Sequence, residues 1–429
     1  MEKRWTVNIY CIAIVCLLSY FELGALRSII YRNQIILIFS LFLGVWIFAS
    51  RGLRSSVTNY EVAWFAAIVV FVVFRNQYLA NGETDVNILY YLLLTLLIFC
   101  MKNTTSWVSY FVKYMYYVSL LHATATIIFA FSPSLFQWYT SHFLSSVYYQ
   151  EAMSRYTKGT ISGLCVNYGA NAAIIAVGLG IALICFLWRK RETRKRQVLP
   201  ILILLAGLLF TGKRSPVILL VLAVAFIYLF SEKGRTNRKV VRVIIVVLAA
   251  VLAVYIGAMF IPQLQILIGR LMDSDDWSTL GGRTELYNLA IEMFKSNPLF
   301  GQGWNAYKLV SSDSIGKVYA SQYSRMQTHN IYLQLLSETG IAGLVFIVAL
   351  FIYPVKGIMH LTRQYGVLEV TGSNDVNDSV NLLSCIYIVL FFLLYGMTGN
   401  PLYDPYMYFL GIIACGGLQG YIVAFRTKF

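Results

Sequence analysis

The sequence contains few charged residues. Only 12% of its 429 residues are Asp, Glu, Lys or Arg, which is about half the share found in an average soluble domain. Hydrophobic residues make up 59% of the chain, and the mean hydropathy is +0.67. A soluble core cannot bury so much apolar surface. The composition therefore predicts an all-α integral membrane protein, with lipid around most of the chain.

Residues in metal-binding patterns are also lacking. The chain has four histidines, and its seven cysteines lie within or beside apolar runs, without CxxC or other metal-ligand spacing. This pattern excludes the common zinc and iron–sulfur motifs, and we interpret the cysteines as small apolar residues. They are Cys11, Cys16, Cys100, Cys165, Cys185, Cys385 and Cys415.

Long apolar runs make up much of the sequence, and they predict about twelve transmembrane helices. The first run follows Lys3 and Arg4 and lacks a small-x-small cleavage site, so we expect it to be retained as a helix. The runs lie near residues 5–23, 34–49, 61–74, 87–101, 114–131, 165–188, 198–211, 216–230, 240–261, 331–355, 382–397 and 404–425.

The basic residues set the predicted orientation. The net charge of +15 does not indicate nucleic acid, because the Lys and Arg residues crowd short segments between apolar runs. The two densest are RKRETRKR (189–196) and EKGRTNRKVVR (232–242). Such segments stay in the cytoplasm. With twelve spans, both termini are then cytoplasmic.

This topology places two long segments on the extracytoplasmic side, Ser132–Leu164 and Pro262–Thr328. We therefore expect transmembrane helices 1–9 in residues 1–261, a large extracytoplasmic loop in 262–328, and transmembrane helices 10–12 in 329–429. Within the loop, Thr284–Ser296 has the spacing of an amphipathic helix that ends before Pro298. Its apolar face consists of Leu286, Leu289, Ala290 and Met293.

The turn TGKRSP (211–216) is the first candidate site. Its Lys213 and Arg214 precede a helix that Ser215 can cap, and cations there oppose the helix dipole unless an anion joins them. A helix N-terminus beside an arginine is a good phosphate site. The alternative is a Lys/Arg pair that anchors a short helix end at the membrane surface.

Two further candidates lie within the large loop and directly after it. Arg283 follows two glycines in GGRTELY, where the backbone can approach a ligand, although the arginine could equally pair with a nearby aspartate. His329 lies where the loop enters the next helix and could act as a general base near pH 7. Asn330 could orient it or bind a sugar hydroxyl. The alternative is a histidine with only a capping role.

A further polar pair lies in SGLCVNYGANAA (162–173). Asn167 and Asn171 fall at the outer end of a predicted helix, where they could line a cavity for a lipid head group. Helix packing through small residues explains the segment equally well.

The stretch from Gly281 to Leu344 resembles the O-antigen ligase / O-antigen polymerase family. An arginine before a helix leads to a P-x-x-G-x-G turn, and HN-x-Y-L then opens a helix that contains E-x-G-x-x-G-L. The TGKRSP turn resembles the second arginine-bearing turn of that family, and residues 162–173 resemble its asparagine-containing motif.

The resemblance implies a GT-C-like membrane glycosyltransferase of the bacterial inner (plasma) membrane, working on its extracytoplasmic side without metal, nucleotide or other cofactor. It would move a glycan from an undecaprenyl-diphosphate carrier to a sugar hydroxyl. Arg214 and Arg283 would hold the diphosphate, with Lys213 beside them, and His329 would activate the acceptor. The acceptor would be a carrier-linked glycan, and a chain-length regulator is a further partner that the resemblance allows.

Three functions stay open at this point. A polymerase, which would build a surface polysaccharide such as a capsule, is the commoner type. A ligase would instead transfer the glycan to lipid A-core or protein. A flippase for lipid-linked oligosaccharides fits twelve helices, but coupled transporters usually carry carboxylates in mid-membrane. Glu22, Glu61 and Asp404 lie only at the ends of apolar runs.

Overall fold

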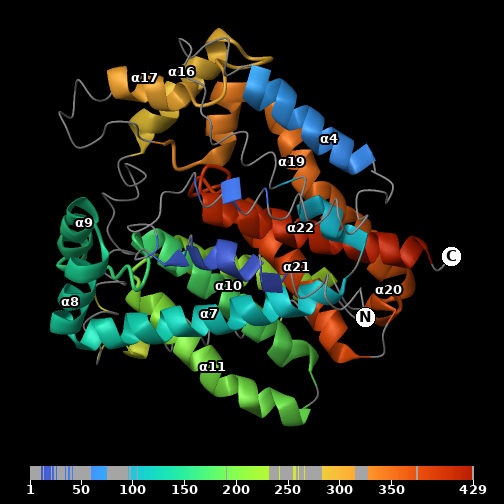
Figure 1. Ribbon diagram of the computed structural model, residues 1–429, viewed down its shortest axis with the longest axis horizontal. Coiled ribbons are helices and arrows are strands. Elements are labelled where there is room, and N and C mark those ends of the chain that lie inside the picture. The colour runs from blue at the N-terminus through green and yellow to red at the C-terminus, as the bar shows by residue number, and fades with distance from the viewer. Residues whose placement is uncertain are drawn as a thin grey trace.

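A computed structural model of the chain is shown in Figure 1. The structure describes residues 59–74, 98–103, 105–189, 191–230, 283–314, 327–372 and 375–427, with scattered positions in 11–41, at 95 and in 241–265. This part of the chain consists of helices and turns and contains no strand, in agreement with the predicted all-α class.

Five described helices are long and apolar enough to cross a membrane, and shorter apolar helices accompany them. The predicted runs 34–49, 87–101 and 240–261 lie wholly or largely outside the described residues. The number of twelve spans therefore stays a prediction. The five helices are α7 (Ser106–Phe131), α10 (Tyr168–Trp188), α19 (Ile331–Tyr365), α21 (Val376–Tyr395) and α22 (Pro405–Arg426).

Helices α10, α21 and α22 form the centre of the bundle and are buried along most of their length. Helices α7, α11 (Arg191–Phe210) and α12 (Ser215–Phe230) pack against α10. Small residues allow this close approach, as expected where lipid supplies no hydrophobic drive between helices. A Cβ on Gly178 of α10 would lie 2.1 Å from Cβ of Ser119 on α7.

The structure adds helices where the sequence indicated only connecting segments. The outer segment Ser132–Leu164 contains α8 (Pro133–Phe143) and α9 (Ser146–Tyr156), which lie side by side at the left of Figure 1. Helix α11 begins inside the basic run 189–196. Its charged side chains interrupt the apolar pattern that marks a helix in the sequence, so the helix start was not visible there.

The amphipathic helix of the large loop is confirmed as α16 (Thr284–Ser296), with Leu286, Ala290 and Met293 buried. It packs on α17 (Ala306–Ser314) and on α19. The hydroxyl of Tyr307 donates a hydrogen bond of 2.9 Å to the carbonyl oxygen of Leu286. This pair of short helices covers one corner of the bundle (Figure 1).

The direction of the helices gives the bundle two different ends. Helices α10, α12 and α19 begin at the end that carries α8, α9, α16 and α17, and α11 and α21 finish there. Helix α11 begins, and α22 finishes, at the opposite end, near α20 (Val367–Thr371). The basic run 189–196 therefore lies at this opposite end of the bundle. The positive-inside rule predicts that this end is cytoplasmic.

Helix α19 is broken at Gly340, where φ is 66° and ψ is −169°. Hydrogen bonds join the segment that begins at Pro298 to two backbone carbonyls before the break and to two backbone amides after it. Gln302 and Gly303 donate to the carbonyls of Ser337 and Glu338, at 2.9 and 2.7 Å. Ile341 and Ala342 donate to those of Pro298 and Leu299, at 2.9 and 3.2 Å. The P-x-x-G-x-G and E-x-G motifs thus form one interlocked unit.

We expect Gly340→Ala to disrupt this interlock and to lower thermal stability in detergent strongly. A Cβ there would lie 2.4 Å from the carbonyl carbon of Leu299, and the backbone conformation is one that only glycine adopts readily. Gly366→Ala is the matched control, because Gly366 shares the conformation (φ 92°, ψ 157°) but has open space around its Cα. Equal melting temperatures for the two variants would contradict the steric part of this explanation.

Candidate functional site

Three of the residues predicted from the sequence lie at helix N-termini. Lys213 lies in the turn before α12, Arg283 is the N-cap residue of α16, and His329 immediately precedes Asn330, the N-cap of α19. A helix N-terminus carries a partial positive charge. Lys213 and Arg283 therefore add to a positive potential that the backbone already creates.

Lys213 is the centre of this arrangement. Its Nζ lies 5.1 Å from the ring centre of Tyr168, the first residue of α10, and Cζ of Arg155 on α9 lies 5.6 Å from the same ring. Burial lowers the pKa of Lys213, and the charges of Arg283 and Arg155 lower it further, while Tyr168 acts in the opposite direction. We call Arg155, Lys213 and Arg283 the cation cluster.

His329 stands beside the cation cluster with its backbone in the left-handed region, at φ 55°. Thr328 holds this conformation, since its Oγ1 donates to the carbonyl of Asn330 at 2.7 Å and accepts from the amide of Asn330 at 3.1 Å. Crowding by protein atoms lowers the pKa of His329 to about 4, and the charges of Arg283 and Lys213 contribute. The imidazole still reaches solvent, and at pH 7 it is neutral.

In the part of the chain that the structure describes, the cation cluster contacts an aromatic ring and a carbonyl oxygen. Among the described residues, neither Arg155, Lys213, Arg283 nor His329 forms an ion pair with an acid. Arg283 donates instead to the carbonyl oxygen of Thr398, at 3.3 Å. Lys213 and Arg283 are partly buried, whereas Arg155 is exposed. A partly buried cation without a counter-charge is costly, and a bound anion removes that cost. The arrangement can therefore bind a multiply charged anion such as a diphosphate.

The structure distinguishes the two cations of the TGKRSP turn. Lys213 is the one whose charge acts on His329. Arg214 is half-buried, and its carbonyl oxygen accepts from Val217 and Ile218 in the first turn of α12. The catalytic role predicted for Arg214 stays a prediction.

The three predicted asparagines all make structural contacts. Asn330 caps α19 through its Oδ1, and Asn167 caps α10 by accepting from Gly169 at 2.6 Å. Asn171 is fully buried, where its amide contacts His122 and Thr126 of α7. The substrate-binding role predicted for these asparagines stays a prediction.

A buried polar network lies behind His329. Gln334 accepts from Asn400 at 2.9 Å and donates to Glu338 at 3.1 Å, and Glu338 also accepts from Tyr403. Asn400 further contacts Thr328. The network thereby connects the residue next to His329 with α19 and with the segment between α21 and α22. Such networks fix a side chain in one position when all their members are satisfied.

Several residues of this region could not be assigned to the site from the sequence. Arg155 and Tyr168 come from segments without a charge pattern, and only the fold brings them to Lys213. Glu338 was noted in the sequence only as the first residue of the E-x-G-x-x-G-L motif, although its side chain is fully buried. Its position in an apolar helix was the available signal, because buried acids need partners. Within the described residues, no group of three or more His, Cys, Asp or Glu side chains is placed to hold a metal ion.

The fold and the site together define a helical membrane protein with a cluster of cations at one end of its bundle. Residues 199–348 match the family model described as O-antigen ligase. The match confirms the predicted resemblance and supports the assignment of the chain to the O-antigen ligase/polymerase family. It covers Lys213, Arg214, Arg283 and His329, but not Arg155 or Tyr168. No curated protein matches the chain.

We expect removal of one cation to raise the pKa of His329. In Lys213→Gln, the imidazole should titrate closer to its ordinary pKa of about 6.5, because a repulsive charge is lost. Histidine-selective NMR in nanodiscs can measure this, since the chain has only four histidines. Lys295→Gln, on the exposed side of α16, is the control and should leave the titration unchanged. Identical titration in both variants would show that the cluster does not act on His329.

Proposed function

We propose that the protein transfers a glycan from a polyprenyl-diphosphate carrier to a sugar hydroxyl at the cation cluster. The family match supports a membrane enzyme that transfers glycans. The observation that carries the finer proposal is the cation cluster, which forms no ion pair with an acid among the described residues. Two of its members, Lys213 and Arg283, act on a neutral histidine.

The cations suit the leaving group of this reaction. As the bond between the anomeric carbon and the phosphate oxygen breaks, the electron pair and negative charge pass to the carrier diphosphate. Fixed cations and helix N-termini stabilise that charge without having to reorganise. Arg283 and Lys213 would contact the diphosphate, and Arg155 would act from its position beside the Tyr168 ring.

His329 would accept the proton of the acceptor hydroxyl as its oxygen attacks the anomeric carbon. With a pKa of about 4, the imidazole is always neutral near pH 7 but is a weak base. Bound diphosphate would offset the charges of Arg283 and Lys213, and this would raise the pKa of His329. Binding of the donor substrate would therefore make His329 a stronger base for accepting the proton of the acceptor hydroxyl.

The two candidate reactions, polymerisation and ligation, differ in the acceptor of the glycan. We retain polymerisation, with a carrier-linked glycan as acceptor, as the first candidate. The family description as O-antigen ligase favours the second candidate, transfer to lipid A-core or protein. Both use the same donor site, so the cation cluster is required for either.

We expect Lys213→Gln and Arg283→Gln each to weaken binding of farnesyl diphosphate by about tenfold or more, the effect of losing one charge-assisted hydrogen bond. Thermophoresis of the full-length protein in nanodiscs can measure the affinity. Lys295→Gln is the control and should bind like wild type. Unchanged affinity in both site variants would exclude the cluster as the diphosphate site.

We expect Arg283→Ala and His329→Ala to abolish glycan transfer in a deletion strain complemented at matched protein levels. Gels of surface glycans report the product. For a polymerase, wild type gives a ladder and the variants leave single repeat units.

Long carrier-linked polymer that is not attached to its acceptor would instead identify a ligase. Wild-type ladders in both variants would refute the catalytic proposal and would make transport the leading explanation.

A further inference from the structure

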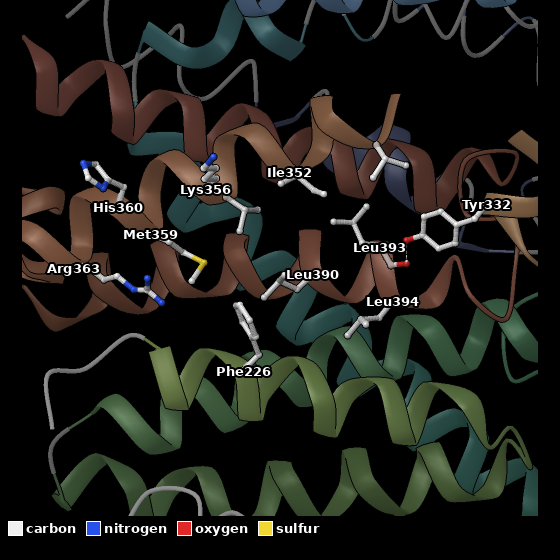
Figure 2. A pocket seen from close by; sticks show the side chains of 12 residues that line it. Phe226, Tyr332, Ile352, Lys356, Met359, His360, Arg363, Leu390, Leu393 and Leu394 are labelled. Atoms are coloured by element: carbon white, nitrogen blue, oxygen red, sulfur yellow. Dashed lines mark hydrogen bonds between the residues drawn. The ribbon is translucent and has the colours of Figure 1, made fainter. Parts of the chain in front are cut away.

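A groove of about 570 Å³ runs between helices α12, α19 and α21. Apolar side chains line most of it, among them Phe226 of α12, Val348 and Ile352 of α19, and Leu390 and Leu394 of α21. Figure 2 shows Phe226, Ile352 and Leu390 directed into the space between the three helices. The catalytic arrangement described above uses none of them.

One end of the groove is basic. Lys356, His360 and Arg363 line it, and their spacing of four and three residues places them on one face of α19 (Figure 2). All three side chains are exposed. The basic end of the groove lies at the end of the bundle away from the cation cluster, which is the end predicted to be cytoplasmic.

The other end of the groove is closed by a tyrosine. The hydroxyl of Tyr332 donates a hydrogen bond of 2.6 Å to the carbonyl oxygen of Leu393. Tyr332 follows Asn330 in the first turn of α19, on the side of the cation cluster. The groove therefore has an apolar body and a single cationic end.

We propose that this groove binds an anionic glycerophospholipid, with an acyl chain along the apolar body and the phosphate at Lys356 and Arg363. Basic pockets between helices on the cytoplasmic side suit anionic lipid head groups. Lysine and arginine can also extend their aliphatic stems along the groove while their charges reach the head-group level.

The position of the charges argues against a carrier lipid in this groove. A carrier bound at the cation cluster would carry its diphosphate at the Tyr332 end and only hydrocarbon at the far end. Three basic side chains would then face an apolar chain. An anionic lipid from the opposite leaflet places its charge where the basic residues are, so the proposal does not depend on glycan transfer.

The test uses the full-length protein, purified in detergent and exposed to phosphatidylglycerol and phosphatidylcholine, with bound lipid counted by native mass spectrometry. We expect wild type to retain phosphatidylglycerol preferentially. Lys356→Gln and Arg363→Gln should each reduce this preference by about fivefold. Ile352→Trp, which keeps every charge but fills the groove, should remove the bound lipid.

Two controls separate the groove from general effects. Arg426→Gln removes an exposed cation at the same end of the bundle, from α22. Leu121→Trp enlarges an exposed apolar residue on α7. Both should bind phosphatidylglycerol like wild type.

Equal retention of the two lipids by wild type would overturn the proposal, as would an equal loss in Arg426→Gln. Displacement of phosphatidylglycerol by polyprenyl phosphate at equal concentration would also overturn it, because the groove would then be a carrier site. Failure here leaves farnesyl diphosphate binding at the cation cluster unaffected, so it is distinguishable from failure of the proposed function.

Discussion

Positive charge concentrated at helix N-termini is the constraint on which the candidate site of this protein depends. Helices α10, α12, α16 and α19 begin around the same region, and Lys213 and Arg283 stand at two of those beginnings, beside the neutral His329. Helix dipoles and side-chain charges of one sign repel each other. The rest of the bundle must hold these groups together against that repulsion, and a bound diphosphate would relieve it.

The interlock at Gly340 provides much of that restraint. It connects the segment that follows α16 to the broken helix α19 through four backbone hydrogen bonds. The network of Gln334, Asn400 and Glu338 then fixes the loop that carries His329. Arg283 and His329 are thus supported by the same part of α19, although the large loop separates them in the sequence. Helices α16 and α17 and the membrane bundle form one structural unit.

The structural features that depend on local sequence patterns could be predicted. The apolar face of α16 and its end before Pro298 follow from helical spacing, and the long apolar helices follow from hydropathy. Arg155 and Tyr168 could not be predicted in this way, because their contacts with Lys213 depend on how α9 and α10 pack. The break at Gly340 was also missed, since a glycine inside an apolar run does not reveal the backbone partners that make the break stable.

The interlock has a consequence for how such chains can change over evolutionary time. Its hydrogen bonds join backbone atoms, so most side chains around it can be exchanged without loss of the junction. Gly301 and Gly340 are different, because a Cβ on either would lie 2.4 Å from backbone of the other segment. Distant relatives with this junction can therefore differ at almost every position around it and still need glycine at these two.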